Sequence, residues 1–229
     1  MQNFHISNLD KLIIKRKARR RKRIKILVIL SVVFIMLLGV VYSVFQSEFS
    51  NININKVFRK KLNVKTITAP EYVDVQNINI GFARTGVKLI EINNIVIHYV
   101  GNPDTTAQNN RDYFNKPDTT VCSHFVIGLE GEIIQCVPMD EKSNASNNRN
   151  LDTISIEVCH PDSTGKFNES TYDSLVKLTA WLCDNSGLDE DDVIRHYDIT
   201  GKVCPKYFVD NESEWDFFKK DIQLALENY

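Results

Sequence analysis

The stretch INNIVIHYVGN, residues 92–102, decides the fold class that the sequence predicts. Its centre is a run of apolar, β-branched residues that a Gly-Asn pair ends, which is the pattern of a strand buried on both faces. Because side chains alternate along a strand, His98 shares one face with Val96 and Val100. A polar ring at such a buried position needs a hydrogen-bond partner or a metal.

The segments that follow alternate between helix and strand patterns. Residues 103–114 have a Thr cap and helical spacing, and residues 168–187 have apolar positions at helical spacing before a terminal glycine. Residues 123–138 form two β-rich runs around Glu130 and Gly131, which predicts a hairpin. Residues 152–160 predict a strand and residues 213–229 a terminal helix. This alternation predicts an α/β domain, with a mixed central β-sheet flanked by helices.

The first 45 residues differ from the rest in charge and hydropathy. Residues 1–25 hold ten Lys and Arg against one acid, whereas the other 204 residues hold 18 basic and 28 acidic residues, a net charge of −10. Residues 26–45 then run for 20 positions without a charge. As a helix, this segment would span roughly 30 Å, the thickness of a bilayer's hydrocarbon core. We therefore expect a basic cytoplasmic tail at 1–25 and a single N-terminal transmembrane helix at 26–45.

This order of segments also predicts a location. A basic flank stays in the cytoplasm, so the rest of the chain would lie outside it. A cleaved signal peptide is the competing interpretation, but its apolar region is usually about 7–15 residues and ends at a small-residue site, which we do not find. Residues 46–69 are polar and predict a stalk, and residues 70–229 the folded domain. We expect a monomeric, single-pass cell-membrane protein with an extracytoplasmic domain and no nucleic-acid partner.

Five cysteines, an odd number, leave at least one thiol without a disulfide partner: Cys122, Cys136, Cys159, Cys183 and Cys204. An extracytoplasmic domain permits disulfides, but the chain has no CxxC pair and not the spacing of a disulfide-dense scaffold. The alternative for four of them is that they are small buried apolar residues.

A second stretch, RHYDITGKVCPKYF at residues 195–208, places His196 and Cys204 eight residues apart. Together with His98 these side chains would supply the three protein ligands of a catalytic zinc site, which leaves one position for water. A single histidine is more often a hydrogen-bonded core or surface residue than a ligand, and spacing alone does not show that distant residues meet.

Four motifs in order resemble the zinc-dependent N-acetylmuramoyl-L-alanine amidases of the type 2 group, which includes the peptidoglycan recognition proteins. The motifs are IVIHYVGN, SHFVIGLEGEIIQCVP, TISIEVCHP and RHYDITGKVCP, and the likeness covers roughly residues 78–229. The resemblance implies a peptidoglycan hydrolase that cleaves the amide bond between the N-acetylmuramoyl lactyl group and L-alanine of the stem peptide.

The resemblance also assigns roles to residues. It implies Zn²⁺ as the cofactor, with His98, His196 and Cys204 as its ligands. It implies Glu157 as the general base that activates the zinc-bound water. It implies Lys202 as a cation that stabilises the oxyanion of the tetrahedral intermediate.

The sequence departs from the family pattern at two places. Ser123 stands where some members have a tyrosine, so Glu157 would carry the base role alone. A polar segment, EKSNASNNRN at residues 141–150, replaces the WHAG segment of many members. Two alternatives stay open: a non-catalytic peptidoglycan-binding module, and a zinc hydrolase of another amide bond. We expect His124 to be a hydrogen-bonded structural residue and His160 to lie at the surface.

Overall fold

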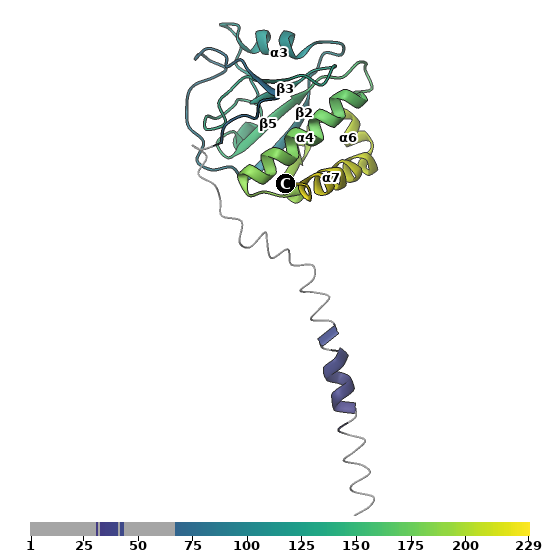
Figure 1. The fold of residues 1–229 in the computed structure, drawn as a ribbon. Helices are drawn as coiled ribbons and strands as arrows, with labels where there is room; N and C mark the ends of the chain where they lie inside the picture. Colours follow the sequence, from purple (N-terminus) through teal and green to yellow (C-terminus); the bar gives the residue numbers. More distant parts are fainter. Residues whose placement is uncertain (1–30, 32, 41, 44–66) are drawn as a thin grey trace, which may run out of the picture. The chain divides into compact units, whose positions relative to one another are not determined.

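The structure is a computed structural model that describes residues 31, 33–40, 42–43 and 67–229 of the 229-residue chain (Figure 1). The chain divides into two units, Met1–Val57 and Phe58–Tyr229. All six strands of the described sheet belong to the second unit.

The predicted transmembrane helix at residues 26–45 lies partly outside the described residues. Of those described there, residues 31, 33–40 and 42–43 are helical. A stretch such as 33–40 covers about 12 Å at 1.5 Å per residue, and a membrane span needs about 30 Å. In the part of the chain that the structure describes, no helix is long and apolar enough to cross a membrane. This finding overturns the predictions of a transmembrane helix and of a single-pass membrane location. The predicted tail at 1–25, and the stalk except for residues 67–69, lie outside the described residues.

A six-stranded mixed sheet forms the centre of the second unit (Figure 1). Its strands are Val73–Val75 (β1), Asn94–Tyr99 (β2), Phe125–Ile127 (β3), Ile133–Gln135 (β4), Thr153–Val158 (β5) and Val193–Arg195 (β6). They lie in the order β1-β4-β3-β5-β2-β6, and β3 and β4 pair antiparallel as the predicted hairpin while the other neighbours pair parallel. The prediction of a mixed α/β sheet is confirmed.

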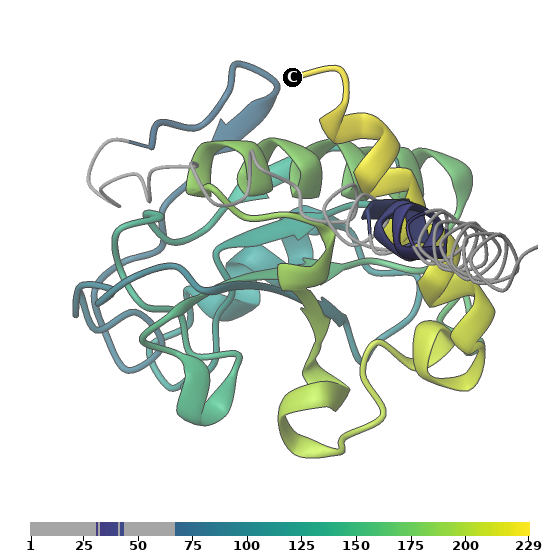
Figure 2. The same cartoon turned by 90° about the horizontal axis from the view of Figure 1, so that it is seen from below.

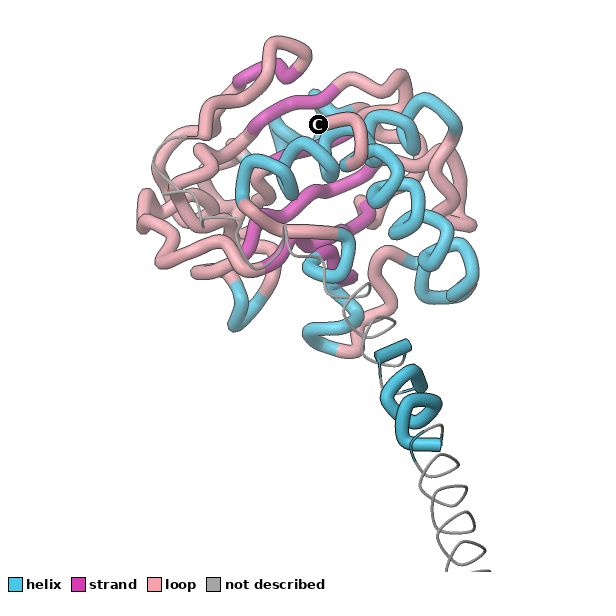
Figure 3. Tube along the Cα trace, turned by 60° about the horizontal axis from the view of Figure 1, so that its bottom comes forward, coloured by secondary structure: helices cyan, strands magenta, loops and turns pink. Residues whose placement is uncertain are grey.

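Helices cover both faces of this sheet. Ala107–Phe114 (α3) packs on β3 and β4, and Glu169–Ser186 (α4) packs on β2, β3 and Glu212–Leu226 (α7). Figure 1 shows α3 on one side of the strands and α4 with α7 on the other, and Figures 2 and 3 show the same layers from two further directions. Four short helical segments complete the described unit: Asn147–Arg149 (η2), Glu190–Asp192 (η3), His196–Thr200 (α5) and Lys206–Asp210 (α6).

Helix α4 follows directly from its sequence. The Asn168 side chain accepts a hydrogen bond from the backbone N–H of Thr171 at the start, and Gly187 ends the helix in the left-handed region at φ 69°. The apolar positions Leu175, Leu178 and Leu182 are all fully buried. Truncating one such leucine to alanine typically costs about 2–5 kcal/mol, so this face of α4 contributes strongly to the core.

The two central strands β2 and β5 separate a core face from a site face. Ile95 and Ile97 of β2, with Ile154 and Ile156 of β5, belong to the large apolar cluster that includes α4 and α7. The residues next to these isoleucines in each strand point their side chains to the opposite face of the sheet. The parallel register pairs His98 directly with Glu157 on that opposite face. The sheet therefore brings a histidine and a carboxylate, 59 residues apart in the sequence, to one surface.

Candidate metal centre

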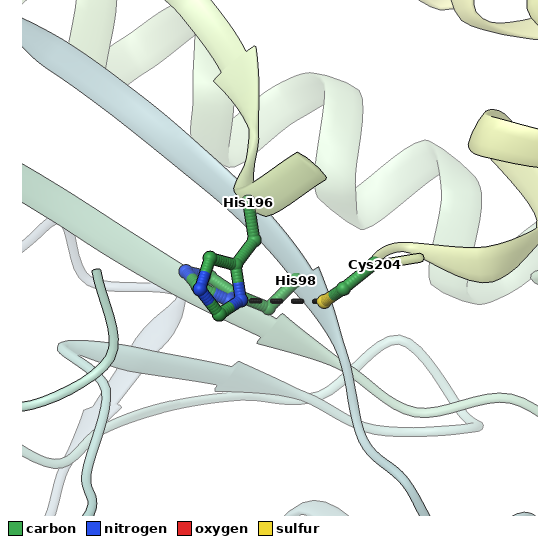
Figure 4. Close-up of side chains that lie close together, drawn as sticks. All are labelled: His98, His196 and Cys204. Carbon is green, nitrogen blue, oxygen red and sulfur yellow. Dashed lines mark hydrogen bonds between the residues drawn. The ribbon is translucent and has the colours of Figure 1, made fainter. Parts of the chain in front are cut away.

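Three side chains from three segments converge beside the end of β2. One ligand atom each from His98, His196 and Cys204 lies within 4.8 Å of the others, and all three residues are buried. Figure 4 shows the His98 and His196 rings and the Cys204 sulfur pointing toward one another, from a strand, the start of a short helix and a loop. The structure thus brings together the three residues that the sequence singled out as metal ligands.

A short loop, closed by a backbone hydrogen bond, holds His196 and Cys204 at this position. Gly201 ends α5 in the left-handed conformation at φ 76°, which turns the chain back toward the sheet. The backbone N–H of Tyr197 then donates to the carbonyl of Cys204 at 2.9 Å and closes the loop. Arg195, directly before His196, is buried and forms ion pairs with Asp198 at 2.9 Å and with Glu212 at 2.6 Å. These contacts fix the backbone on both sides of His196.

The distances are compatible with a small tetrahedral ion. The Nδ1 atom of His98 lies 3.8 Å from the Sγ atom of Cys204. In a tetrahedral zinc site, bonds of about 2.0–2.3 Å place neighbouring ligand atoms roughly 3.3–3.6 Å apart. Since all three ligand atoms lie within 4.8 Å of one another, small rotations of the side chains would bring them to coordination distance.

Unpaired buried atoms point to the same conclusion. Three buried side-chain atoms here have no hydrogen-bond partner among the described residues: Nε2 of His98, Nδ1 of His196 and Oε2 of Glu157. A buried polar atom without a partner costs about 1–3 kcal/mol. Nδ1 of His196 and Oε2 of Glu157 are thus available to a metal and a polar ligand, and two imidazoles with one thiol are the donors that zinc prefers.

The protonation of the three side chains follows from their burial. Burial, with the charges of His196 and Lys202, holds the pKa of His98 well below its usual range. Burial and the charge of Lys202 also lower the pKa of His196. Both rings are thus held in the neutral form that can bind a metal. Burial raises the pKa of the Cys204 thiol to about 12, so metal binding has to release its proton.

Glu157 and Lys202 lie beside this cluster. Glu157 Oε1 is 4.0 Å from Nδ1 of His98, and burial raises the pKa of this carboxyl to about 8 against the opposing effect of Lys202. The charge of the exposed Lys202 adds to the lowering of the pKa of both histidines. It also opposes the rise that burial causes in the pKa of Glu157 and of Cys204. All five residues line one cleft with a volume of about 810 Å³, which is large enough to hold a small peptide or sugar fragment.

Among the lining residues that sequence reasoning did not assign to this cleft, Asn147 contacts a predicted metal ligand. Its Oδ1 atom lies 2.9 Å from Nε2 of His196. Asn147 belongs to the polar segment 141–150, whose asparagines predict turns and give no sign of which one reaches a histidine.

The other histidines and thiols of the domain are structural. His124 is fully buried and contacts Ser155 and Glu141, as expected for a structural residue. The expectation that His160 lies at the surface is wrong, because this residue is 2% exposed and its Nε2 atom lies 2.7 Å from the carbonyl oxygen of Val100. All five cysteines of the chain are buried, and the structure holds no disulfide between them.

Comparison with known proteins identifies the family. A family model described as N-acetylmuramoyl-L-alanine amidase matches residues 88–207, more than half of the chain. The chain belongs to this amidase family. The matched region contains all three clustered side chains as well as Glu157 and Lys202, so the site lies inside the family domain.

Individual amidases agree with this assignment. N-acetylmuramoyl-L-alanine amidase CwlL of Bacillus licheniformis is 31% identical over 165 residues, and BlyA of Bacillus subtilis is 30% identical over 166 residues. These matches cover 64% and 63% of this chain and 45% of each relative, so the chain spans about half the length of these curated amidases. The solved catalytic domain of XlyA is 25% identical, with a TM-score of 0.58 over 66% of this chain and 98% of that domain.

Proposed function

We propose that this chain is a zinc-dependent N-acetylmuramoyl-L-alanine amidase. Its substrate would be peptidoglycan, and the bond cleaved would be the amide between the lactyl group of N-acetylmuramic acid and L-alanine of the stem peptide. The observation that carries the proposal is the convergence of His98, His196 and Cys204 next to Glu157, in a cleft of a chain that belongs to the amidase family.

His98, His196 and Cys204 would hold the metal. Their donor set of two imidazoles and one thiolate suits zinc and does not suit magnesium or calcium, which prefer oxygen ligands. A zinc ion bound by these side chains would supply a Lewis acid and a water molecule with a pKa lowered toward about 7.

Glu157 would move the proton. Its carboxylate takes a proton from the attacking water and gives that proton to the nitrogen of the leaving L-alanine. A group that both accepts and returns a proton works best when its pKa lies near the working pH. Burial raises the pKa of Glu157 to about 8 in the metal-free site, and the charge of a bound zinc ion would lower it from there. The neighbouring Oε2 atom, which is buried and has no partner among the described residues, is free to receive that proton.

Lys202 would stabilise negative charge. As the amide carbonyl is attacked, its oxygen becomes an oxyanion, and a nearby ammonium group lowers the energy of that state. The exposed Lys202 lines the cleft, and its charge already acts on the neighbouring Glu157 and His196. The monomeric state expected from the sequence stays a prediction.

Digestion of purified peptidoglycan tests the proposal. The full-length protein is incubated with cell-wall sacculi, with and without a metal chelator, and the released fragments are identified by mass spectrometry. Free stem peptides that begin with L-alanine, absent when the chelator is present, are the expected products. Disaccharides or shortened peptides would instead show a different bond specificity, and intact sacculi would favour a binding module without activity.

A further inference from the structure

Asn147 has an unusual backbone conformation at the rim of the cleft. Asp104 and Asn147 are the non-glycine residues with positive φ in the described part of the chain, at 61° and 53°. Such a conformation costs roughly 1 kcal/mol or more and persists where the surrounding structure enforces it. At Asn147 this conformation coincides with the 2.9 Å contact between its side-chain Oδ1 atom and Nε2 of His196.

The direction of that hydrogen bond determines which nitrogen of His196 is free. An amide oxygen can only accept, so Nε2 of His196 carries the hydrogen. Nδ1 then carries the lone pair, and this atom has no partner among the described residues. We infer that Asn147 is a positioning residue that fixes the ring and the tautomer of His196, so that Nδ1 is presented to the metal.

The segment around Asn147 is anchored firmly enough for this role. The Oδ1 atom of Asn150 accepts hydrogen bonds from the backbone N–H groups of Ala145 at 3.2 Å and of Ser146 at 2.7 Å. Arg149 donates to Asn94, at the start of β2, at 2.6 Å. The turn that carries Asn147 is therefore tied to the same strand that carries His98. Partners of this kind fix the orientation and raise the basicity of metal-binding histidines, and their loss typically costs about 10–100-fold in metal affinity.

Three substitutions separate the hydrogen bond from the backbone effect. Asn147→Gly adopts positive φ without strain but removes the acceptor. Asn147→Asp keeps the shape of the side chain and offers only acceptor oxygens, so it should retain the hydrogen bond from Nε2 of His196. Asp104→Gly is the matched control, because it relaxes the other positive φ. In each full-length variant, zinc affinity is measured by competition with a chromophoric chelator, and the His196 tautomer is read from ¹⁵N chemical shifts of the metal-free protein.

This inference rests on the metal site of the proposed function. Zinc affinity of the wild type tests that site, and the ¹⁵N chemical shifts test the His196 tautomer that Asn147 is inferred to fix. We expect Asn147→Gly to bind zinc about 10–100-fold more weakly and to lose the pure Nε2–H tautomer. Asn147→Asp should bind zinc at least as tightly as wild type, because a carboxylate partner raises the basicity of a metal-binding histidine, and Asp104→Gly should stay within about threefold of wild type. A wild-type protein that binds no zinc would overturn the proposed metal site and this inference together. Normal zinc binding by wild type and Asn147→Gly alike, with an unchanged tautomer, would overturn this inference alone, as would an Asp variant that fails as badly as the Gly variant.

Discussion

His124 predicts a specific loss of stability in acid. Its Nδ1 atom accepts a hydrogen bond from the backbone N–H of Ser155 at 3.0 Å, and its Nε2 atom lies 2.8 Å from the carbonyl oxygen of Glu141. One nitrogen therefore accepts and the other donates, which only the neutral ring can do. Protonation would place a hydrogen on Nδ1 against the N–H of Ser155. Burial accordingly lowers the pKa of His124 to about 4.

The magnitude follows from the difference between the folded and unfolded pKa values. In the unfolded chain His124 has a pKa of about 6.5, so the difference is about 2.5 units at about 1.4 kcal/mol each. Above pH 6.5 the ring is neutral in both states and the full stability is present. Between pH 6.5 and pH 4 the unfolded chain binds a proton that the folded chain does not, so the free energy of unfolding falls by about 3 kcal/mol.

The assay compares wild type with His124→Gln by urea denaturation at several pH values between 7.5 and 4. The variant is less stable at pH 7 because it loses the buried, hydrogen-bonded imidazole ring of His124. It also has no group at this position that takes up a proton between pH 6.5 and pH 4. We therefore expect the stability difference between the two proteins to shrink by about 3 kcal/mol as the pH falls. Other titrating groups contribute to both curves and cancel in the difference. Two curves that stay parallel across this range would refute the assignment of a neutral, doubly hydrogen-bonded His124.

Three further predictions concern the site and the core. Glu157→Gln should keep the fold and the bound zinc but lose about 10²–10⁴ in rate on peptidoglycan, and a rate within a few-fold of wild type would mean that another group is the base. Lys202→Ala should also keep zinc and lose about 10²–10³ in rate, and an unchanged rate would remove its role at the oxyanion. Leu178→Ala, in the fully buried face of α4, should lower the free energy of unfolding by about 2–5 kcal/mol in urea denaturation. A loss below about 1 kcal/mol would mean that α4 contributes far less to the core than its burial indicates.

Local patterns in the sequence predicted the elements of the domain well, because each element carries its own signals. The apolar run at β2, the glycine turn between β3 and β4, and the capped helix α4 all appear where the sequence places them. The strand order did not follow from these signals, since β6 lies beside β2 although 93 residues separate Tyr99 from Val193. The uncharged segment at 26–45 suggested a spanning helix from composition alone, and the described residues there do not form one.

The candidate site was predictable where residues belong to a motif and hidden where they do not. His98, His196 and Cys204 stood in motifs that resemble the amidase family, and the fold brings them together. Asn147 lies outside these motifs. Its contact with His196 depends on the conformation of the turn around it, which the sequence does not reveal. His160 was misplaced because a histidine before a proline suggests an exposed turn, whereas the fold buries its ring under Val100.

Zinc content tests the central claim most directly. Full-length wild type, Cys204→Ser and Cys183→Ser are purified under identical conditions, and zinc per chain is measured by elemental analysis. Cys183 is an equally buried cysteine of α4 that belongs to the core cluster and does not line the cleft, so it controls for the loss of a cysteine as such. We predict one zinc per chain in wild type and Cys183→Ser, and a large loss in Cys204→Ser, because a serine hydroxyl is a poor zinc ligand. Equal zinc in wild type and Cys204→Ser, or none in either, would contradict the assignment of His98, His196 and Cys204 as a metal site.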